Sequence, residues 1–155
     1  MSRVIRIISV GKTHDPLLVD AITEYEKRCT NTLRISWQLI APAKEASIEK
    51  TVATEGNHII KNLKEAEYVI LLDEKGSMLT SEHFSDLVFD SLSKNNAVTI
   101  IIGGAYGVSS EVKHRADTVM AFGRMVLPHQ LMRLVLCEQL YRAVSIHNGN
   151  KYHHS

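Results

Sequence analysis

Two parts of the sequence carry residues that could do chemistry, a glycine-rich loop and a tyrosine–histidine pair near the carboxyl terminus. The apolar, β-branched run Val98–Ile102 is followed by Gly103, Gly104 and Gly107. Glycines between a strand and a helix let backbone N–H groups approach a nucleotide-like ligand, although the same residues also make ordinary tight turns. From the residues alone, both interpretations of this loop stay open.

The second part is the end of the chain, where Tyr152 and His153 follow Gly149, and Arg142 stands four residues after Glu138. A phenol, an imidazole and a guanidinium can donate a hydrogen bond, accept a proton or stabilise a negative charge. The structural alternatives are a frayed chain end for the Tyr-His pair and an ordinary i,i+4 ion pair for Glu138 and Arg142.

The rest of the sequence predicts the elements that position these residues. Five short apolar runs rich in β-branched residues are typical of buried strands, and helical periodicity separates them. The predicted strands are Val4–Val10, Leu33–Ile40, Tyr68–Leu72, Val98–Ile102 and Thr118–Phe122. Alternating strands and helices predict an α/β fold, with a mostly parallel sheet sandwiched by helices in a single domain over residues 1–155.

Ligands in parallel α/β sheets bind beyond the carboxyl ends of the strands. Here those ends are Leu72, the Gly103–Gly104 step and the Phe122–Gly123 step. We expect a ligand pocket at this edge of the sheet.

Three element boundaries follow from capping and turn residues. Asp15 followed by Pro16 predicts the start of a helix, and Ser109 or Ser110 can cap the helix after the glycine loop. Residues 43–65 predict an exposed amphipathic helix interrupted near Gly56, and Asp73–Gly76 predicts a turn. Pro42 ends the second strand, which we expect near a sheet edge.

Composition limits the function classes. The 155 residues hold 18 Lys/Arg and 17 Asp/Glu, which excludes a polybasic nucleic-acid binder, although residues 105–155 carry a net charge of +3. The two cysteines form no C-x-x-C pair, so we expect no zinc site and no disulfide framework. No apolar run approaches the roughly 18 residues of a membrane span. We therefore expect a soluble, cytoplasmic protein that needs no metal and no membrane.

The helix after Pro128 is apolar on nearly every side. Its apolar residues leave no continuous polar face, and they are Leu131, Met132, Leu134, Val135, Leu136, Cys137, Leu140, Tyr141, Val144 and Ile146. A chain of this size buries such a helix most easily against a second copy of itself. We expect a homodimer through this helix.

Several motifs together give the chain a more specific likeness. They are Gly11-Lys12, Glu24-Tyr25-x-Lys27-Arg28, Ile102-Gly103-Gly104-x-x-Gly107, Leu127-Pro128-His129-Gln130-x-Met132-Arg133, Glu138-Gln139-x-Tyr141-Arg142-Ala143 and Tyr152-His153. The chain resembles, from Val4 to His154, the ribosomal RNA large subunit methyltransferase H family of small SPOUT-class enzymes. His154 is a departure, because some members carry a basic residue after Tyr-His.

The resemblance implies a C-terminal trefoil knot, a rare exception to un-knotted topology. It also implies methylation of N3 of a pseudouridine in 23S rRNA of the large ribosomal subunit, with S-adenosylmethionine as methyl donor. The implied cofactor residues are Leu72, Gly103, Gly104, Phe122, Gly123, Arg124, Met125, Val126 and Leu127. The near-neutral charge favours the assembled ribosome over naked RNA as the substrate.

The N3 imide is a weak acid, so the enzyme must help to remove its proton or stabilise the anion. Tyr152, His153 and Arg142 are the candidate catalytic residues, and Arg142 suits charge stabilisation or an RNA contact because arginine is not a base at neutral pH. Two other functions stay open, a nucleotide-binding oxidoreductase and a non-catalytic ribosome-binding protein. Only Gly11 follows the first strand, which counts against the oxidoreductase.

Overall fold

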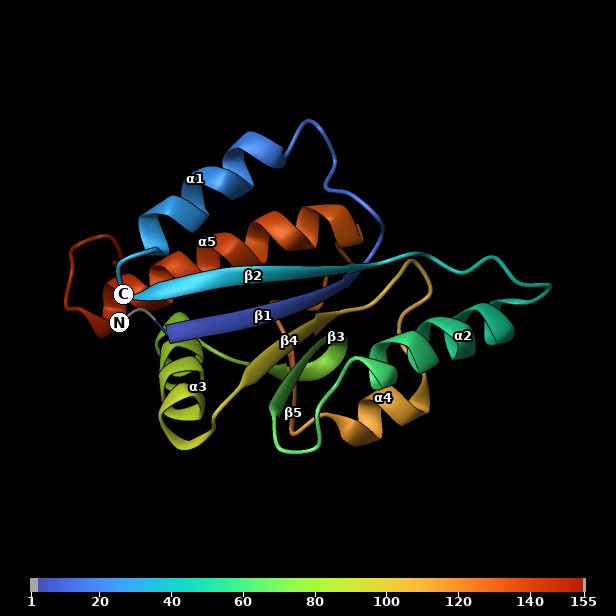
Figure 1. Cartoon of the computed structure of the whole chain (residues 1–155). Helices are drawn as coiled ribbons and strands as arrows, with labels where there is room; N and C mark the ends of the chain where they lie inside the picture. Colours follow the sequence, from blue (N-terminus) through green and yellow to red (C-terminus); the bar gives the residue numbers. More distant parts are fainter. Residues whose placement is uncertain (1–2, 155) are drawn as a thin grey trace.

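The computed structural model describes residues 3–154, in which five strands alternate with five helices (Figure 1). The strands are β1 (Arg3–Val10), β2 (Leu33–Ile40), β3 (Tyr68–Met78), β4 (Val98–Ile102) and β5 (Thr118–Ala121). The helices are α1 (Val19–Cys29), α2 (Ile48–Lys61), α3 (Ser81–Lys94), α4 (Ser110–Arg115) and α5 (His129–His147).

The five strands form one sheet in the order β2-β1-β4-β3-β5, and every pair is parallel. Parallel neighbours need crossover connections, which the helices supply. β2 lies at an edge of the sheet, as its terminal proline predicts. The predicted α/β fold with a parallel sheet is confirmed.

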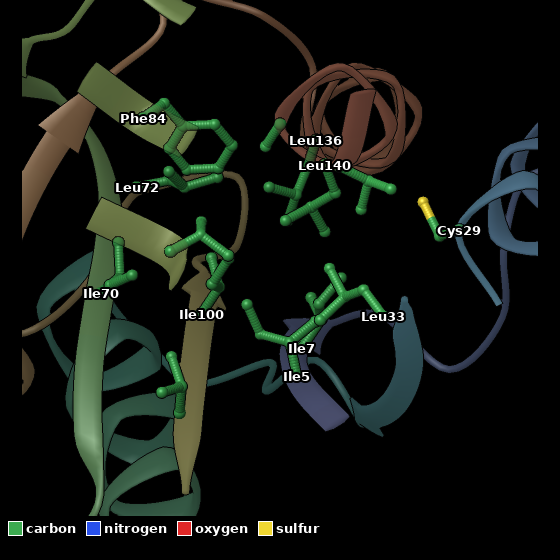
Figure 2. Close-up of a cluster of buried hydrophobic side chains, with 14 of the residues drawn as sticks. Ile5, Ile7, Cys29, Leu33, Ile70, Leu72, Phe84, Ile100, Leu136 and Leu140 are labelled. Atoms are coloured by element: carbon green, nitrogen blue, oxygen red, sulfur yellow. The ribbon is translucent and has the colours of Figure 1, made fainter. Parts of the chain in front are cut away.

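Helices cover both faces of the sheet. The larger apolar cluster joins α1, α3 and α5 to one face, and Figure 2 shows Leu136 and Leu140 of α5 pointing toward strand residues such as Ile7 and Ile100. The smaller cluster joins α2 and α4 to the other face through Ile59 and Val112. The chain is therefore layered as helix, sheet and helix.

The interpretation of α5 as a helix without a solvent face is wrong in part. Leu136, Cys137 and Leu140 are fully buried, but they pack in the core of their own chain. Leu131 is 37% exposed, and Leu134 and Val135 are half-buried. One side of α5 is thus covered by the sheet, α1 and α3, and only the other side is free for a partner.

The predicted end of the strand at an Asp73–Gly76 turn is wrong in part: β3 continues to Met78, although Asp73 makes a local turn by accepting a hydrogen bond from Lys75 N–H at 2.8 Å. The strand shifts register after Leu72 and pairs again with β5 through Ser77 and Met120. Gly76 permits this path, since a Cβ there would lie 2.6 Å from the backbone nitrogen of Met120. The glycine serves a close approach between strands rather than a turn.

The predicted interruption of the second helix near Gly56 is also wrong. α2 runs unbroken from Ile48 to Lys61, and Gly56 is buried against Ser109, where a Cβ would lie 2.3 Å from the Ser109 hydroxyl oxygen. The same hydroxyl accepts a hydrogen bond from the backbone N–H of Val112 at 3.3 Å, so Ser109 caps α4 as expected. The glycine permits helix packing at the cost of helix propensity.

The start of the first helix lies later than its cap residues predict. α1 begins at Val19, and Asp15 instead closes a turn before it by accepting a hydrogen bond from Leu17 N–H at 2.9 Å. Aspartate commonly makes such local turns with the backbone two residues on.

Arg133 ties α5 to the loop after β1. Its side chain is fully buried and donates hydrogen bonds to the Ser9 hydroxyl at 2.8 Å and to the carbonyls of Val10, Gly11 and Thr13 at 3.0, 3.1 and 2.7 Å. Burial lowers the pKa of the guanidinium. Among residues 3–154 no carboxylate pairs with it. Backbone carbonyls therefore replace a counter-ion.

Replacing Arg133 with Met should lower the free energy of unfolding by about 3–5 kcal/mol, because several buried acceptors lose their donor together. Urea denaturation followed by circular dichroism measures the loss. Arg34→Met, at an exposed position on β2, is the control and should change stability by less than about 0.5 kcal/mol. Equal stability of both variants would contradict a central role for the Arg133 hydrogen bonds.

Candidate functional site

The sheet register brings three of the predicted cofactor residues together. Leu72 of β3 pairs with Ile102 of β4 and, on its other side, with Met120 of β5. Gly103 and Phe122 lie just beyond these two partners, so they flank Leu72 at one edge of the sheet. Leu72 and Phe122 also share the larger apolar cluster. The strand ends meet where the sequence predicts a pocket.

The glycine loop after β4 is a tight turn with tightly packed backbone. The Gly107 N–H donates to the Gly104 carbonyl at 3.1 Å, and Gly107 has a φ of +81°, which favours glycine. A Cβ on Gly103 would lie 2.6 Å from a methyl carbon of Val108. Gly103 and Gly107 thus form the tight turn that is one of the two interpretations of this loop. The backbone of the loop lies at the strand ends, so the turn does not exclude contact with a ligand.

The loop after β5 is different, because it leaves space. Gly123 has no atom within 4 Å of the position of a Cβ, and the segment up to Leu127 has no helix or strand. Met125 and Val126 are 85% and 73% exposed, and Arg124 is exposed too. Apolar side chains in water next to an open glycine are typical of a surface that a ligand or a second chain covers.

The chain end packs against α5 rather than fraying. The Tyr152 ring meets Tyr141 edge to face, with centroids 4.5 Å apart, and the Tyr152 hydroxyl donates to Glu138 at 3.2 Å. The Arg142 guanidinium also donates to Glu138 and lies 5.0 Å from the centre of the Tyr152 ring. His153 stands 3.1 Å from Arg142. The three candidate catalytic residues therefore form one cluster around Glu138.

Electrostatics separates the roles that these groups can take. Burial, helped by the Tyr25 hydroxyl and the Glu138 carboxylate, raises the pKa of Tyr152 to about 12, so the phenol stays protonated near pH 7 and does not act as a phenolate base. The hydrogen bond to Glu138 raises the pKa of Arg142, which stays a cation. Of the three candidates, His153 has the side-chain type that most often accepts a proton in catalysis, and its two ring nitrogens face Arg142 and Glu82.

Glu82 is a member of this cluster that the sequence does not single out. It lies in the first turn of α3, and a carboxylate oxygen of Glu82 is 2.9 Å from His153 Nε2. This contact lowers the pKa of Glu82. Two residues later, Phe84 meets Phe122 edge to face with ring centroids 5.7 Å apart. The start of α3 thus separates the tail from the strand ends.

Comparison with known proteins identifies the family. A family model described as "Predicted SPOUT methyltransferase" matches residues 4–153. The chain belongs to this SPOUT methyltransferase family. It is also 38% identical to ribosomal RNA large subunit methyltransferase H of Caldicellulosiruptor bescii, over 96% of this chain and 99% of that protein. The relatives of that name from Desulfitobacterium hafniense and Streptococcus sanguinis are 42% and 40% identical, over 96% of this chain and 98% of theirs.

Membership confirms the resemblance that the motifs carry, and with it an enzyme that transfers methyl groups. The full-length coverage leaves the nucleotide-binding oxidoreductase without support. Within residues 3–154 of this SPOUT methyltransferase, no helix is long and apolar enough to cross a membrane, and no group of three or more His, Cys, Asp or Glu side chains is arranged to hold a metal ion.

Proposed function

We propose that this SPOUT methyltransferase transfers a methyl group from S-adenosylmethionine to N3 of a pseudouridine in 23S rRNA. The observation that carries the proposal is the match along nearly the whole chain to relatives named for the large-subunit rRNA. We also propose that residues 1–155 form one domain, which the single sheet supports, and that this domain has the C-terminal trefoil knot implied by the family.

The cofactor site proposed here lies at the ends of β3, β4 and β5. Leu72 and Phe122 offer apolar surface, the Gly103–Gly104 step offers backbone, and residues 123–127 offer space beside Gly123 with exposed apolar groups. An adenosine ring suits that apolar surface, and Arg124 is a cation that suits the ligand's carboxylate. When bound, the cofactor supplies an electrophilic methyl group.

The tail residues then deal with the proton and the charge of the target base. His153 accepts the N3 proton, directly or through water, while Arg142 stabilises the negative charge on the ring. Tyr152 positions the tail through its hydrogen bond to Glu138 and its packing on Tyr141. The protein's main contribution is to hold the two reactants in line.

We propose that two copies of the chain assemble through the free side of α5 and the loop before it. Met125, Val126 and Leu131 are exposed there, next to the half-buried Leu134 and Val135. Water-exposed apolar groups gathered in one place favour a protein partner. In such a dimer the loop that carries the proposed cofactor residues lies at the interface, where a tail from the second copy can reach it.

The substrate proposed is the assembled ribosome, and the compartment the cytoplasm. With 18 Lys/Arg against 17 Asp/Glu, the chain has little charge with which to grip naked RNA. A ribosome presents its RNA in a fixed shape. Recognition of that shape supplies binding free energy that the few phosphate contacts of this chain do not.

The experiment that tests the function uses ribosomes from a strain that lacks this gene, incubated with the protein and labelled S-adenosylmethionine. Mass spectrometry of nuclease fragments should find one new methyl group, on N3 of a pseudouridine in 23S rRNA. If the protein binds ribosomes but the rRNA carries no label, the result favours a non-catalytic ribosome-binding protein.

Replacing Gly123 with Ala tests the cofactor site without disturbing the unbound chain, because the added methyl group meets no atom within 4 Å and Gly123 does not have a positive φ. A ligand that uses this space should lose at least tenfold in affinity, as measured by calorimetry with S-adenosylhomocysteine. The melting temperature should stay at the wild-type value. Unchanged affinity would move the pocket away from the loop after β5.

Replacing Leu131 with Asp tests the dimer. The side chain is partly exposed, so a single chain tolerates the charge, whereas an apolar interface does not. Sedimentation should show a folded monomer for this variant and a dimer for the wild type. Ile48→Asp, at an exposed position on α2, is the control and should stay dimeric. A dimeric Leu131 variant would rule this surface out.

Removing residues 152–155 tests the tail. S-adenosylhomocysteine affinity should change less than twofold, while single-turnover methyl transfer to ribosomes should fall by about 100-fold or more, as for loss of a general base. His153→Ala should lower the rate and change its pH dependence, whereas Tyr152→Phe should lower the rate with the pH dependence kept. Full activity of the shortened chain would leave the tail without a catalytic role.

A further inference from the structure

A cavity of about 180 Å³ lies at the carboxyl ends of β1 and β4, beside the glycine loop. It is smaller than the roughly 300–1,000 Å³ of pockets for drug-sized ligands, so it suits a single ring rather than a whole cofactor. Val10, Pro42 and Ala43 line it with apolar surface, and Glu55, Tyr106 and His129 line it with polar groups. Of its lining residues, only Gly104 has a function proposed above.

Glu55 is the unusual member of this set. It lies on α2 with Ile48, Val52 and Ile59 at helical spacing, on the apolar side of the helix, and is only 5% exposed. One carboxylate oxygen, Oε2, accepts a hydrogen bond from Ala43 N–H at 3.0 Å. The other, Oε1, receives none from residues 3–154. Among residues 3–154 the buried side-chain polar atom without a partner is Ser145 Oγ, so Glu55 Oε1 still reaches solvent and is an acceptor open to a ligand N–H.

The glycine loop leaves room for that ligand. A Cβ on Gly104 would lie 2.8 Å from Oε1 of Glu55 and 3.3 Å from a methyl carbon of Val10. Any other residue at position 104 would therefore crowd the carboxylate. The glycine keeps Oε1 accessible from the cavity.

His129 and Tyr106 complete a site for a flat polar ring. Burial, with a smaller effect of Arg133, lowers the pKa of His129, so its imidazole is neutral near pH 7 and can donate one hydrogen bond to a carbonyl. Tyr106 is 59% exposed, and its ring offers a face on which a base can stack.

We propose that this cavity binds the target base and that Glu55 accepts a hydrogen bond from N1–H of pseudouridine. The inference rests on the function proposed above. Pseudouridine is joined to its ribose through C5 and keeps a hydrogen on N1, whereas uridine is joined through N1 and has none. Both bases carry N3–H, so an acceptor for N1–H is the group that tells them apart.

The arrangement also turns the reacting atom in the right direction. N1 and N3 stand on either side of one ring carbonyl, so a base whose N1 meets Glu55 directs N3 away from α2. Because β4 lies between β1 and β3, the cavity and Leu72 are separated by about 10 Å, or two strand spacings. The base and the cofactor site share the loop after β4.

Glu55→Gln is the variant that tests the proposal. Glutamine has the same shape, and when its single amide oxygen accepts from Ala43 N–H, it presents the N–H₂ group, a donor, to N1–H. Sites built to hydrogen-bond a substrate N–H discriminate against analogues that lack it by up to about 10⁴–10⁵. We expect the single-turnover rate on ribosomes with the target pseudouridine to fall at least tenfold. The control is Glu49→Gln, at an exposed position of the same helix.

The comparison uses two ribosome preparations, with pseudouridine or unmodified uridine at the target position. The wild type should transfer much faster to pseudouridine, and Glu55→Gln should lose rate on pseudouridine but not on uridine. S-adenosylhomocysteine affinity and melting temperature should match those of the wild type. If uridine ribosomes react too slowly to measure, the loss on pseudouridine with unchanged cofactor affinity is the supporting result.

Four results would overturn the proposal. If the wild-type protein methylates ribosomes with pseudouridine and with uridine at the same rate, it does not recognise N1–H, whatever the variant does. A parallel loss on both bases makes Glu55 a general rather than a selective residue. If Glu55→Gln loses affinity for S-adenosylhomocysteine, the cavity belongs to the cofactor site. If its rate on ribosomes with pseudouridine is unchanged, Glu55 does not recognise the base. If the wild type methylates neither ribosome, the proposed function itself fails.

Discussion

The buried guanidinium of Arg133 fixes the carboxyl edge of the sheet at its β1 end. Its hydrogen bonds to Ser9, Val10, Gly11 and Thr13 hold the loop after β1 against the first turns of α5. A Cβ on Gly11, which has a φ of +124°, would lie 2.7 Å from that guanidinium. The β1 end, the start of α5 and the loops that meet them are thereby fixed with respect to one another, and the proposed base cavity lies among them.

Parallel pairing of β3, β4 and β5 fixes the rest of this sheet edge. Because β3 pairs with β4 and β5 at Leu72, the loops after all three strands are adjacent, although 50 residues of sequence separate Leu72 and Phe122. α3 begins at this edge and contacts the tail through Glu82. This sheet edge therefore carries apolar surface and an open glycine loop, while the start of α3 lies between it and the tail of the same chain, which packs on α5.

Local pattern predicts the elements of this chain well, and it fails where distant contacts decide. All five strands and the parallel sheet follow from short β-branched runs, because such runs are buried on both faces. The glycines at 56 and 76 look like breaks, but Ser109 and Met120, far away in sequence, require the missing side chains. Glu55 escapes notice for the same reason: among many exposed charges, only its place on an apolar helix face marks it. The cofactor residues stay a prediction, which rests on the resemblance to a family and on the position of these residues at strand ends.

We propose that the strand ends hold two adjoining sites, one for the cofactor at the ends of β3, β4 and β5 and one for the base beside Glu55. A crystal structure of the protein with S-adenosylhomocysteine distinguishes the two sites. We expect the ligand against Leu72, Gly103 and residues 122–127, with the cavity beside Glu55 and His129 left free. Ligand density inside that cavity, or away from the loop after β5, would contradict it.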